Sequence, residues 1–271
     1  MRGNRFINMI REQRKIWDMW EEKAKVNGTA LGLTYRDLNI RKMEIETISR
    51  CLRPGTVMLD AGCGNGTAIK SYARRRPRKI VGIDFSPTMI RNARVVLRDE
   101  MKKGNIDLRV GDVTDLQLED ESVDTVVSTR CLINLANKDL QRKAIREFAR
   151  VLKRGGTYLM LESSIQGLDA INSLRVKFGL KRIVSPWHDL NFDERELLPF
   201  LRRSFKVLEL RKFGTFFFLT RLVHPLMVYP KEPQYDARIN EVARDLQLGL
   251  DEDYFDGLGH LFFAKLQKKP A

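Results

Sequence analysis

Residues 57–67 read VMLDAGCGNGT, an apolar run that ends in an acid and then breaks into glycines at 62, 64 and 66. A proline and a glycine precede the run, so it has the length and the boundaries of a buried parallel strand. Closely spaced glycines are typical of a tight turn, and Asn65 and Thr67 are candidate caps for a helix that continues through 72–76. The stretch therefore predicts a strand, a glycine turn and a helix.

This turn also has the properties of a ligand site. Glycines allow the main chain to approach a ligand closely, and the first N–H groups of the following helix face any electron-rich group placed there. Glycine turns also serve plain strand-to-helix connections, so the spacing alone does not establish a site. The segments that follow indicate whether this turn is a ligand site or a plain connection.

Three further apolar runs follow, and polar residues come at or just after their ends. The strand expected at 80–84 ends in Asp84, which is placed to accept hydrogen bonds from two ribose hydroxyls. The run at 106–110 leads to Asp112, an acid suited to an adenine amine, with apolar Val113 beside it. The run at 123–128 leads to Thr129 and Arg130. A parallel sheet brings these strand ends to one edge, and the pattern predicts a nucleotide-like pocket there.

Five segments, in this order, resemble the class I S-adenosylmethionine (SAM) dependent methyltransferases of the methyltransferase domain 11/25 kind. They are LDAGCGNGT, VGIDFSPTMI, VGDVTDL, VDTVVSTRCLINL and RVLKRGGTYLMLE, and they span residues 56–162. The resemblance implies an α/β, doubly wound fold with a Rossmann-like sheet of seven mostly parallel strands. It also implies SAM as cofactor and S-adenosyl-L-homocysteine as product.

The resemblance also implies roles for individual residues. Asp60 would orient the turn and contact the methionine amine. Gly62, Cys63 and Gly64 would lie alongside the methionyl moiety. Asp84 would bind the ribose, and Phe85 and Met89 would flank the adenine. Asp112 would bind the adenine amine, and Val113 would pack on the adenine ring. Thr129, Arg130 and Asn134 would face the reacting centre. Arg41 is the first candidate for the cofactor carboxylate and Arg36 the second, with a plain helix-surface arginine as the alternative for each.

The segments outside the resemblance predict the domain organisation. Residues 1–53 are expected to form an N-terminal helical lid and 54–271 the methyltransferase domain, with acceptor-side insertions at 163–192 and 213–250. The helical pattern at 5–26 places Trp17 and Trp20 on one face. These two rings would either pack the helix onto the domain or cover the cofactor, and both can hold.

The acceptor side offers one candidate base. His188 follows Trp187 in the first insertion, and a histidine titrates near neutrality, which suits general-base catalysis. A structural histidine in a turn is the alternative. The second insertion carries Arg221, His224, Tyr229 and Lys231, a composition that suits a phosphorylated or sugar-like acceptor and equally an apolar cap.

The composition of the chain limits the classes of partner and the compartment that we expect for it. The 271 residues carry a net charge of +14, which permits an anionic acceptor or nucleic acid, although the charge is spread along the chain. No membrane span is expected, because no apolar stretch reaches about 18 residues. Three cysteines in buried segments argue against a disulfide framework and favour the cytoplasm, and the cysteines and histidines show no metal-ligand spacing.

The sequence thus predicts a SAM-dependent methyltransferase that acts on an O or N atom of a small-molecule or saccharide- or phosphate-bearing acceptor. An RNA or protein methyltransferase is the alternative that the charge suggests. A module that binds SAM without catalysis is a third.

Overall fold

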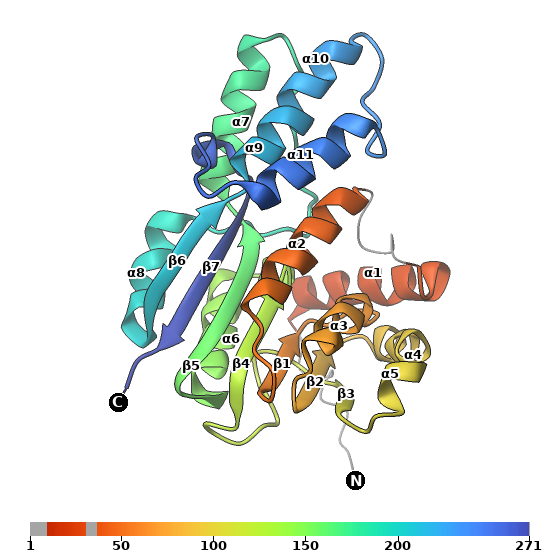
Figure 1. The fold of residues 1–271 in the computed structure, drawn as a ribbon, viewed down its shortest axis with the longest axis vertical. Coiled ribbons are helices and arrows are strands. Elements are labelled where there is room, and N and C mark those ends of the chain that lie inside the picture. The colour runs from red at the N-terminus through yellow and green to blue at the C-terminus, as the bar shows by residue number, and fades with distance from the viewer. Residues whose placement is uncertain (1–9, 31–36, 271) are drawn as a thin grey trace.

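The centre of the molecule is a seven-stranded sheet (Figure 1), and the computed structural model describes residues 10–30 and 37–270. The strands are β1 (Val57–Ala61), β2 (Lys79–Asp84), β3 (Ile106–Val110), β4 (Val123–Thr129), β5 (Leu152–Ser163), β6 (Phe205–Lys212) and β7 (Leu261–Lys268). Their order is β3-β2-β1-β4-β5-β7-β6. All pairs from β3 to β5 are parallel, and β7 runs antiparallel to both of its neighbours. The predicted doubly wound, mostly parallel α/β fold is confirmed.

Helices connect the strands and cover both faces of the sheet. They are α1 (Arg11–Asn27), α2 (Leu38–Cys51), α3 (Thr67–Tyr72), α4 (Pro87–Val96), α5 (Arg98–Met101), α6 (Lys138–Val151), α7 (Ile165–Lys177), α8 (Glu194–Ser204), α9 (Gly214–Phe218), α10 (His224–Val228) and α11 (Arg238–Gly249). Short 3-10 turns lie at η2 (Ala73–Arg75), η3 (Leu132–Asn134) and η5 (Asp256–Leu258), and a π-helical turn, η4 (Leu219–Val223), joins α9 to α10.

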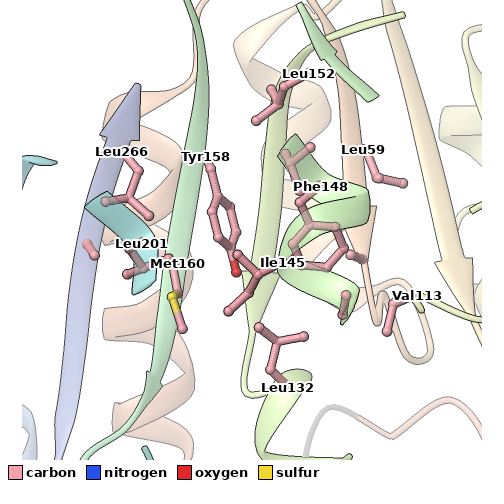
Figure 2. Packing of buried hydrophobic residues seen from close by; sticks show 14 of the residues in the cluster. Leu59, Val113, Leu132, Ile145, Phe148, Leu152, Tyr158, Met160, Leu201 and Leu266 are labelled. Carbon is pink, nitrogen blue, oxygen red and sulfur yellow. The ribbon is translucent and has the colours of Figure 1, made fainter. Parts of the chain in front are cut away.

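The core has two layers because successive strand residues point to opposite faces. In β5, Tyr158 and Met160 pack with α6 and α8, whereas Leu159 and Leu161 pack with α2, α3 and α4. Figure 2 shows the first layer, in which the ring of Phe148 from α6 meets the ring of Tyr158 edge-on at 5.3 Å. Each such buried side chain contributes about 1.5–3 kcal/mol. A run that is buried on both faces explains the continuous apolar pattern of the central strands.

Two local predictions about the helices were wrong. The cap of α3 is Gly66 in a left-handed conformation, with no side-chain bond, because the Thr67 hydroxyl donates to the Asn65 side chain instead of either residue capping the helix. The helix also ends at Tyr72 and tightens into η2.

The two insertions form a helical cap beyond the carboxyl ends of the strands. In Figure 1, α7 from the first insertion stands beside α9, α10 and α11 from the second, above the sheet. The carbonyl of Arg221 in η4 accepts a hydrogen bond from Arg175 of α7. The cap therefore joins segments that are far apart in the sequence.

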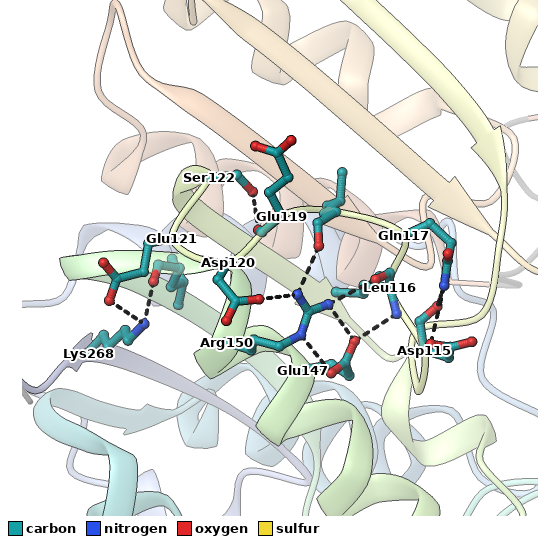
Figure 3. Close-up of polar contacts among 12 residues, drawn as sticks. Asp115, Leu116, Gln117, Glu119, Asp120, Glu121, Ser122, Glu147, Arg150 and Lys268 are labelled. Carbon is teal, nitrogen blue, oxygen red and sulfur yellow. Dashed lines mark hydrogen bonds and ion pairs between the residues drawn. The ribbon is translucent and has the colours of Figure 1, made fainter.

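Arg150 fixes the loop that follows Asp112. Its guanidinium donates to the carbonyls of Leu116 and Leu118, both at 2.8 Å, and to the carboxylates of Asp120 and Glu147 (Figure 3). The carboxylates of Glu147 and Asp120 hold the pKa of Arg150 above its usual value. A guanidinium with this many partners keeps the loop after β3 close to α6.

Within the described ranges, no helix is long and apolar enough to cross a membrane.

Candidate active site

The glycine turn after β1 lies against the ends of β2 and β4. The N–H groups of Gly62 and Cys63 donate to the carbonyl of Ile83 at 2.8 and 3.0 Å. Gly62 has φ of +76°, and a Cβ there would lie 2.5 Å from Sγ of Cys131. Gly64 also has a positive φ, of +54°, but a Cβ there would meet no atom within 4 Å. The turn is thus closed on the β4 side and open beside Gly64.

Asp84 ties β2 to this turn. One carboxylate oxygen accepts from the N–H of Gly64 at 2.8 Å and the other from the N–H of Ser86 at 2.9 Å. Burial raises its pKa to about 6, against the lowering effect of those two hydrogen bonds. Asp84 therefore shapes the turn as well as standing at the predicted ribose position.

Asp60 is buried, and its Oδ2 has no hydrogen-bond partner in the part of the chain that the structure describes. Burial raises its pKa to about 7, while the positive charge of Arg41 acts in the opposite direction. An acceptor atom that is buried without a partner costs free energy unless a ligand supplies a donor. This orphaned oxygen is the clearest sign of a binding site.

The structure shows local contacts for the other predicted cofactor residues. Asp112 accepts from the N–H of Thr114 at 2.8 Å, Val113 belongs to the buried core, and Met89 packs under Trp20 and Ala24. Every polar group of Cys63 is bonded within the turn or to β2: its N–H to Ile83, its carbonyl to Gly66 and its thiol to the Gly64 carbonyl at 3.8 Å. These residues stay predictions as cofactor contacts. Arg36 lies outside the described residues.

Arg41 and Arg130 share a buried carboxylate. Nη1 of Arg41 lies 3.7 Å from Oε2 of Glu44, and Nε of Arg130 lies 3.5 Å from Oε1 of the same side chain. Glu44 is fully buried, so it compensates both positive charges in a region of low dielectric constant. Sequence reasoning missed Glu44, which reads as one more acid on an amphipathic helix.

The loop after β4 is held by Glu162 at the end of β5. Its carboxylate accepts from the N–H groups of Cys131, Leu132 and Ile133 at 3.1 to 3.4 Å, and from the hydroxyl of Ser128. Burial raises the pKa of Glu162 to about 8, although those hydrogen bonds oppose the rise. An acid that ends an apolar strand was the available signal for this residue.

That loop also carries the predicted reacting-centre residues. Arg130 adopts a left-handed conformation, with φ of +46°, and its N–H donates to the carbonyl of Leu161 at 2.8 Å. Burial raises the pKa of Tyr72, and the nearby side chain of Thr129 acts in the opposite direction. Asn134 Nδ2 donates to the carbonyl of Arg130 at 2.8 Å. The structure thus gathers these side chains at one end of β4.

Helix α1 crosses this edge of the sheet. On one side, Trp17 Nε1 donates to the carbonyl of Phe85 at 3.0 Å, and Glu21 accepts from the hydroxyls of Ser86 and Thr88. Burial works to raise the pKa of Glu21, but the hydrogen bonds from Ser86 and Thr88 outweigh it and leave the pKa below its ordinary value. This side of α1 is anchored at the start of α4.

On the other side, α1 binds the loop after β4. Trp20 Nε1 donates to Oδ1 of Asn134 at 2.8 Å, and Gln13 bonds the main chain of Asn134 and Ala136. Since β1 lies between β2 and β4, α1 spans the end of β1 where the glycine turn begins. This position supports the predicted lid.

His188 lies at this second anchor. Its Nδ1 is 3.0 Å from Oδ1 of Asn134 and 3.0 Å from Oδ1 of Asp189, and its ring meets those of Trp20 and Trp187 edge-on. The Asp189 atom is a carboxylate oxygen. The Asn134 atom is the amide oxygen, because the amide nitrogen of Asn134 donates to the carbonyl of Arg130. In the neutral ring the proton therefore sits on Nδ1, and Nε2 carries the free lone pair.

Among the described residues, no group of histidine, cysteine and carboxylate side chains is arranged to hold a metal ion. The orphaned oxygen of Asp60 and the open side of Gly64 leave an unpaired acceptor and free space beside the turn.

Comparison with known proteins agrees with this geometry. Residues 58–156 match the family model described as a methyltransferase domain. The chain is 36% identical over 115 residues to the ubiquinone/menaquinone biosynthesis C-methyltransferase UbiE of Hydrogenovibrio crunogenus, covering 42% of this chain and 44% of that protein. The Vibrio cholerae UbiE is 33% identical over 124 residues, covering 45% and 46%. The match thus spans less than half the length of these curated relatives.

Solved structures share the fold. The [4+2]-cyclase SpnF superposes with a TM-score of 0.60 at 19% identity, covering 96% of this chain and 97% of that one. A geranyl diphosphate methyltransferase, solved with GPP and sinefungin, gives 0.60 at 15% identity, covering 94% and 98%. A cyclase among these structures shows that the fold alone does not fix the reaction. With the family model and the curated relatives in agreement, residues 58–156 form a methyltransferase domain, and the chain is similar to the class I SAM-dependent methyltransferases.

Proposed function

We propose that the protein transfers the methyl group of SAM to an O or N atom of a small polar acceptor, enclosed between α1 and the helical cap. The observation that carries this proposal is the arrangement of His188. Its Nδ1 faces two oxygen acceptors, which leaves Nε2 free as a base beside the end of β4.

The residues present fit SAM. The buried, unpartnered Oδ2 of Asp60 suits an amine donor, and the open side of Gly64 leaves room beside the main chain. Asp84 would accept from the ribose, Asp112 from the adenine, and Arg41 would face the carboxylate. When bound, SAM supplies a methyl group that is already activated by its sulfonium. Arg36 is kept as the second candidate for the carboxylate.

The chain's own task is then to align the acceptor and remove its proton. Nε2 of His188 would take the proton from an acceptor hydroxyl or amine, and Asp189 would stabilise the imidazolium that forms. Trp17 and Trp20 of α1 would exclude water from the reacting atoms. Orientation of this kind contributes about 7–11 kcal/mol to such reactions.

The enclosed acceptor is favoured by where the family match stops. It ends at residue 156, before either insertion, and we infer that the cap residues beyond it serve the acceptor half. C-methylation, which the curated relatives carry in their names, is a second candidate, because the first of these relatives is 36% identical over its matched segment. An RNA or protein substrate is the alternative that the net charge of +14 suggests.

We also place the protein in the cytoplasm. Cys51, Cys63 and Cys131 are free thiols in the structure, a state that a reducing compartment maintains.

The test is transfer of a radiolabelled methyl group from SAM into cell extract that has been separated into small molecules, RNA and protein. The blank is Asp84→Ala, which removes the acceptor for Gly64 and the ribose. Label in small molecules supports the proposal, and the labelled product identifies the atom. Label in RNA or protein contradicts it. Tight SAM binding without label in any fraction would indicate a binding module.

A further inference from the structure

Two arginines meet inside the helical cap, one from each insertion. Arg175 of α7 donates through Nη1 to the main-chain carbonyl of Arg221, and through Nε to the carbonyl of Lys181 at 2.8 Å. Both acceptors are neutral. The guanidinium of Arg175 is thus held in place by groups that do not compensate its charge.

The carboxylates nearby balance only one of the two charges. Arg221 pairs with Asp37, with Nη2 and Oδ2 2.6 Å apart, and the same Asp37 also caps α2. In the described ranges, no carboxylate lies within 4.0 Å of Arg175, and Glu232 acts on it only from an exposed loop. Burial and the nearby charge of Arg221 lower the pKa of Arg175. An anion between the two guanidiniums would relieve this repulsion.

Arg221 is fixed before any ligand arrives. Its guanidinium lies over three aromatic rings, those of Phe216 at 5.8 Å, Phe217 at 5.7 Å and Tyr235 at 5.1 Å. Its side chain is 14% exposed. A binding group that is already immobile loses little entropy on binding.

His260 is close to both Arg221 of the cap and Arg130 at the end of β4, because both charges act on it. Burial lowers the pKa of His260 to about 4, and the charges of Arg130 and Arg221 lower it further, while Asp189 acts in the opposite sense. The carbonyl of Ser164, 3.4 Å from Nδ1 of His260, also opposes this lowering of the pKa.

We propose that Arg175 and Arg221 together bind an oxyanion of the methyl acceptor, either a phosphate or a carboxylate group. The anionic end of the acceptor would lie under the helical cap, with its reacting atom toward His188. This inference rests on the proposed methyl transfer to an enclosed acceptor, and it specifies the chemical class of that acceptor.

The test is calorimetric binding of inorganic phosphate and, separately, acetate to the full-length protein and to Arg175→Gln. Loss of one charge-assisted contact should weaken binding about tenfold to a hundredfold. Arg182→Gln is the matched control, because Arg182 is a solvent-exposed arginine just after α7 that pairs with Asp169. Arg175→Lys, which retains the charge, should recover part of the affinity.

Selective loss of phosphate binding in Arg175→Gln supports a phosphate-bearing acceptor, and selective loss of acetate binding supports a carboxylate. Equal weakening in Arg182→Gln, or no binding of either ion to the wild type, would overturn the inference. SAM binding, measured in the same samples, distinguishes failure of this inference from failure of the proposed function. If SAM binds and no oxyanion does, only this inference fails, whereas absence of SAM binding removes the proposed function as well.

Discussion

Oδ1 of Asn134 accepts a hydrogen bond from Nε1 of Trp20 at 2.8 Å and lies 3.0 Å from Nδ1 of His188. One amide oxygen therefore joins the N-terminal helix, the loop after β4 and the first insertion. These three segments are distant in sequence, with Trp20 and Asn134 separated by 114 positions. Docking of α1 and orientation of the proposed base are consequently parts of one arrangement.

Replacing Trp20 by Phe should slow methyl transfer about fivefold, the effect of losing one hydrogen bond of about 1 kcal/mol. Phenylalanine keeps an aromatic side chain at this position but has no N–H to donate, so the loss would reflect orientation of Asn134. Steady-state kinetics of the variant provide the measurement. Tyr254→Phe, at a ring that is 89% exposed, should match the wild type. Equal rates for Trp20→Phe and wild type would show that this bond does not position the base.

Replacing His188 by Asn should lower kcat by about a hundredfold to ten-thousandfold, the usual effect of removing a general base. The affinity for SAM should not change, because His188 is placed on the acceptor side. Calorimetry with SAM and single-turnover transfer measure the two effects. A parallel fall in SAM affinity would instead make His188 a structural residue.

The glycines of the turn should respond differently to alanine. Gly62→Ala places a Cβ 2.5 Å from Cys131 Sγ in a left-handed conformation, so the free energy of unfolding should fall by about 2–5 kcal/mol. Gly64→Ala meets no atom within 4 Å and should cost only about 1–2 kcal/mol, from the backbone conformation. It should nevertheless weaken SAM binding, because the new methyl group enters the open side. Urea unfolding and SAM titration of both variants check this pair, and a fully stable Gly62→Ala would contradict the packing.

Asp60 should make the ligand-free protein less stable as the pH rises. Its pKa is raised from 3.8 to about 7, so the folded state holds this proton more tightly than the unfolded state. The resulting stability is present at acidic pH and is lost as the pH rises from the unfolded pKa through the folded one. Over that range the free energy of unfolding falls by about 1.4 kcal/mol for each pH unit.

Asp60→Asn removes this contribution. Between about pH 5 and pH 8, the variant should lose less stability than the wild type, as measured by urea unfolding without cofactor. Asp84 and Glu162, whose pKa values are raised to about 6 and 8, act in the same direction in both proteins. The variant should also bind SAM more weakly. Parallel stability profiles for the two proteins would show that Asp60 does not titrate in this range.

The sheet and its polar edge could be predicted because their signals are local. Each strand is a short apolar run, and Asp60 and Asp84 close their runs directly. Helix α1 was also visible, through the spacing of Trp17 and Trp20. Parallel pairing then brings such strand ends together without further information.

The partners of buried charges could not be predicted in this way. Glu21 meets Ser86 across 65 positions, and Glu44 meets Arg130 across the interface between α2 and the loop after β4. Glu21 and Glu44 look like solvated acids of amphipathic helices in the sequence, since nothing local marks them as buried. The prediction for the cap of α3 was wrong because the side chains of Asn65 and Thr67 bond each other, and Gly66 takes the N-cap position.

The antiparallel strand β7 lies between β5 and β6, although it follows both in the chain. While the polypeptide is being synthesised, β5 and β6 have no strand between them until residues 261–268 have left the ribosome. Their unpaired edges are open to mispairing during that interval. The contacts of β7 are also highly non-local, which slows folding. Assembly of the sheet that carries the proposed acceptor site therefore awaits the last strand.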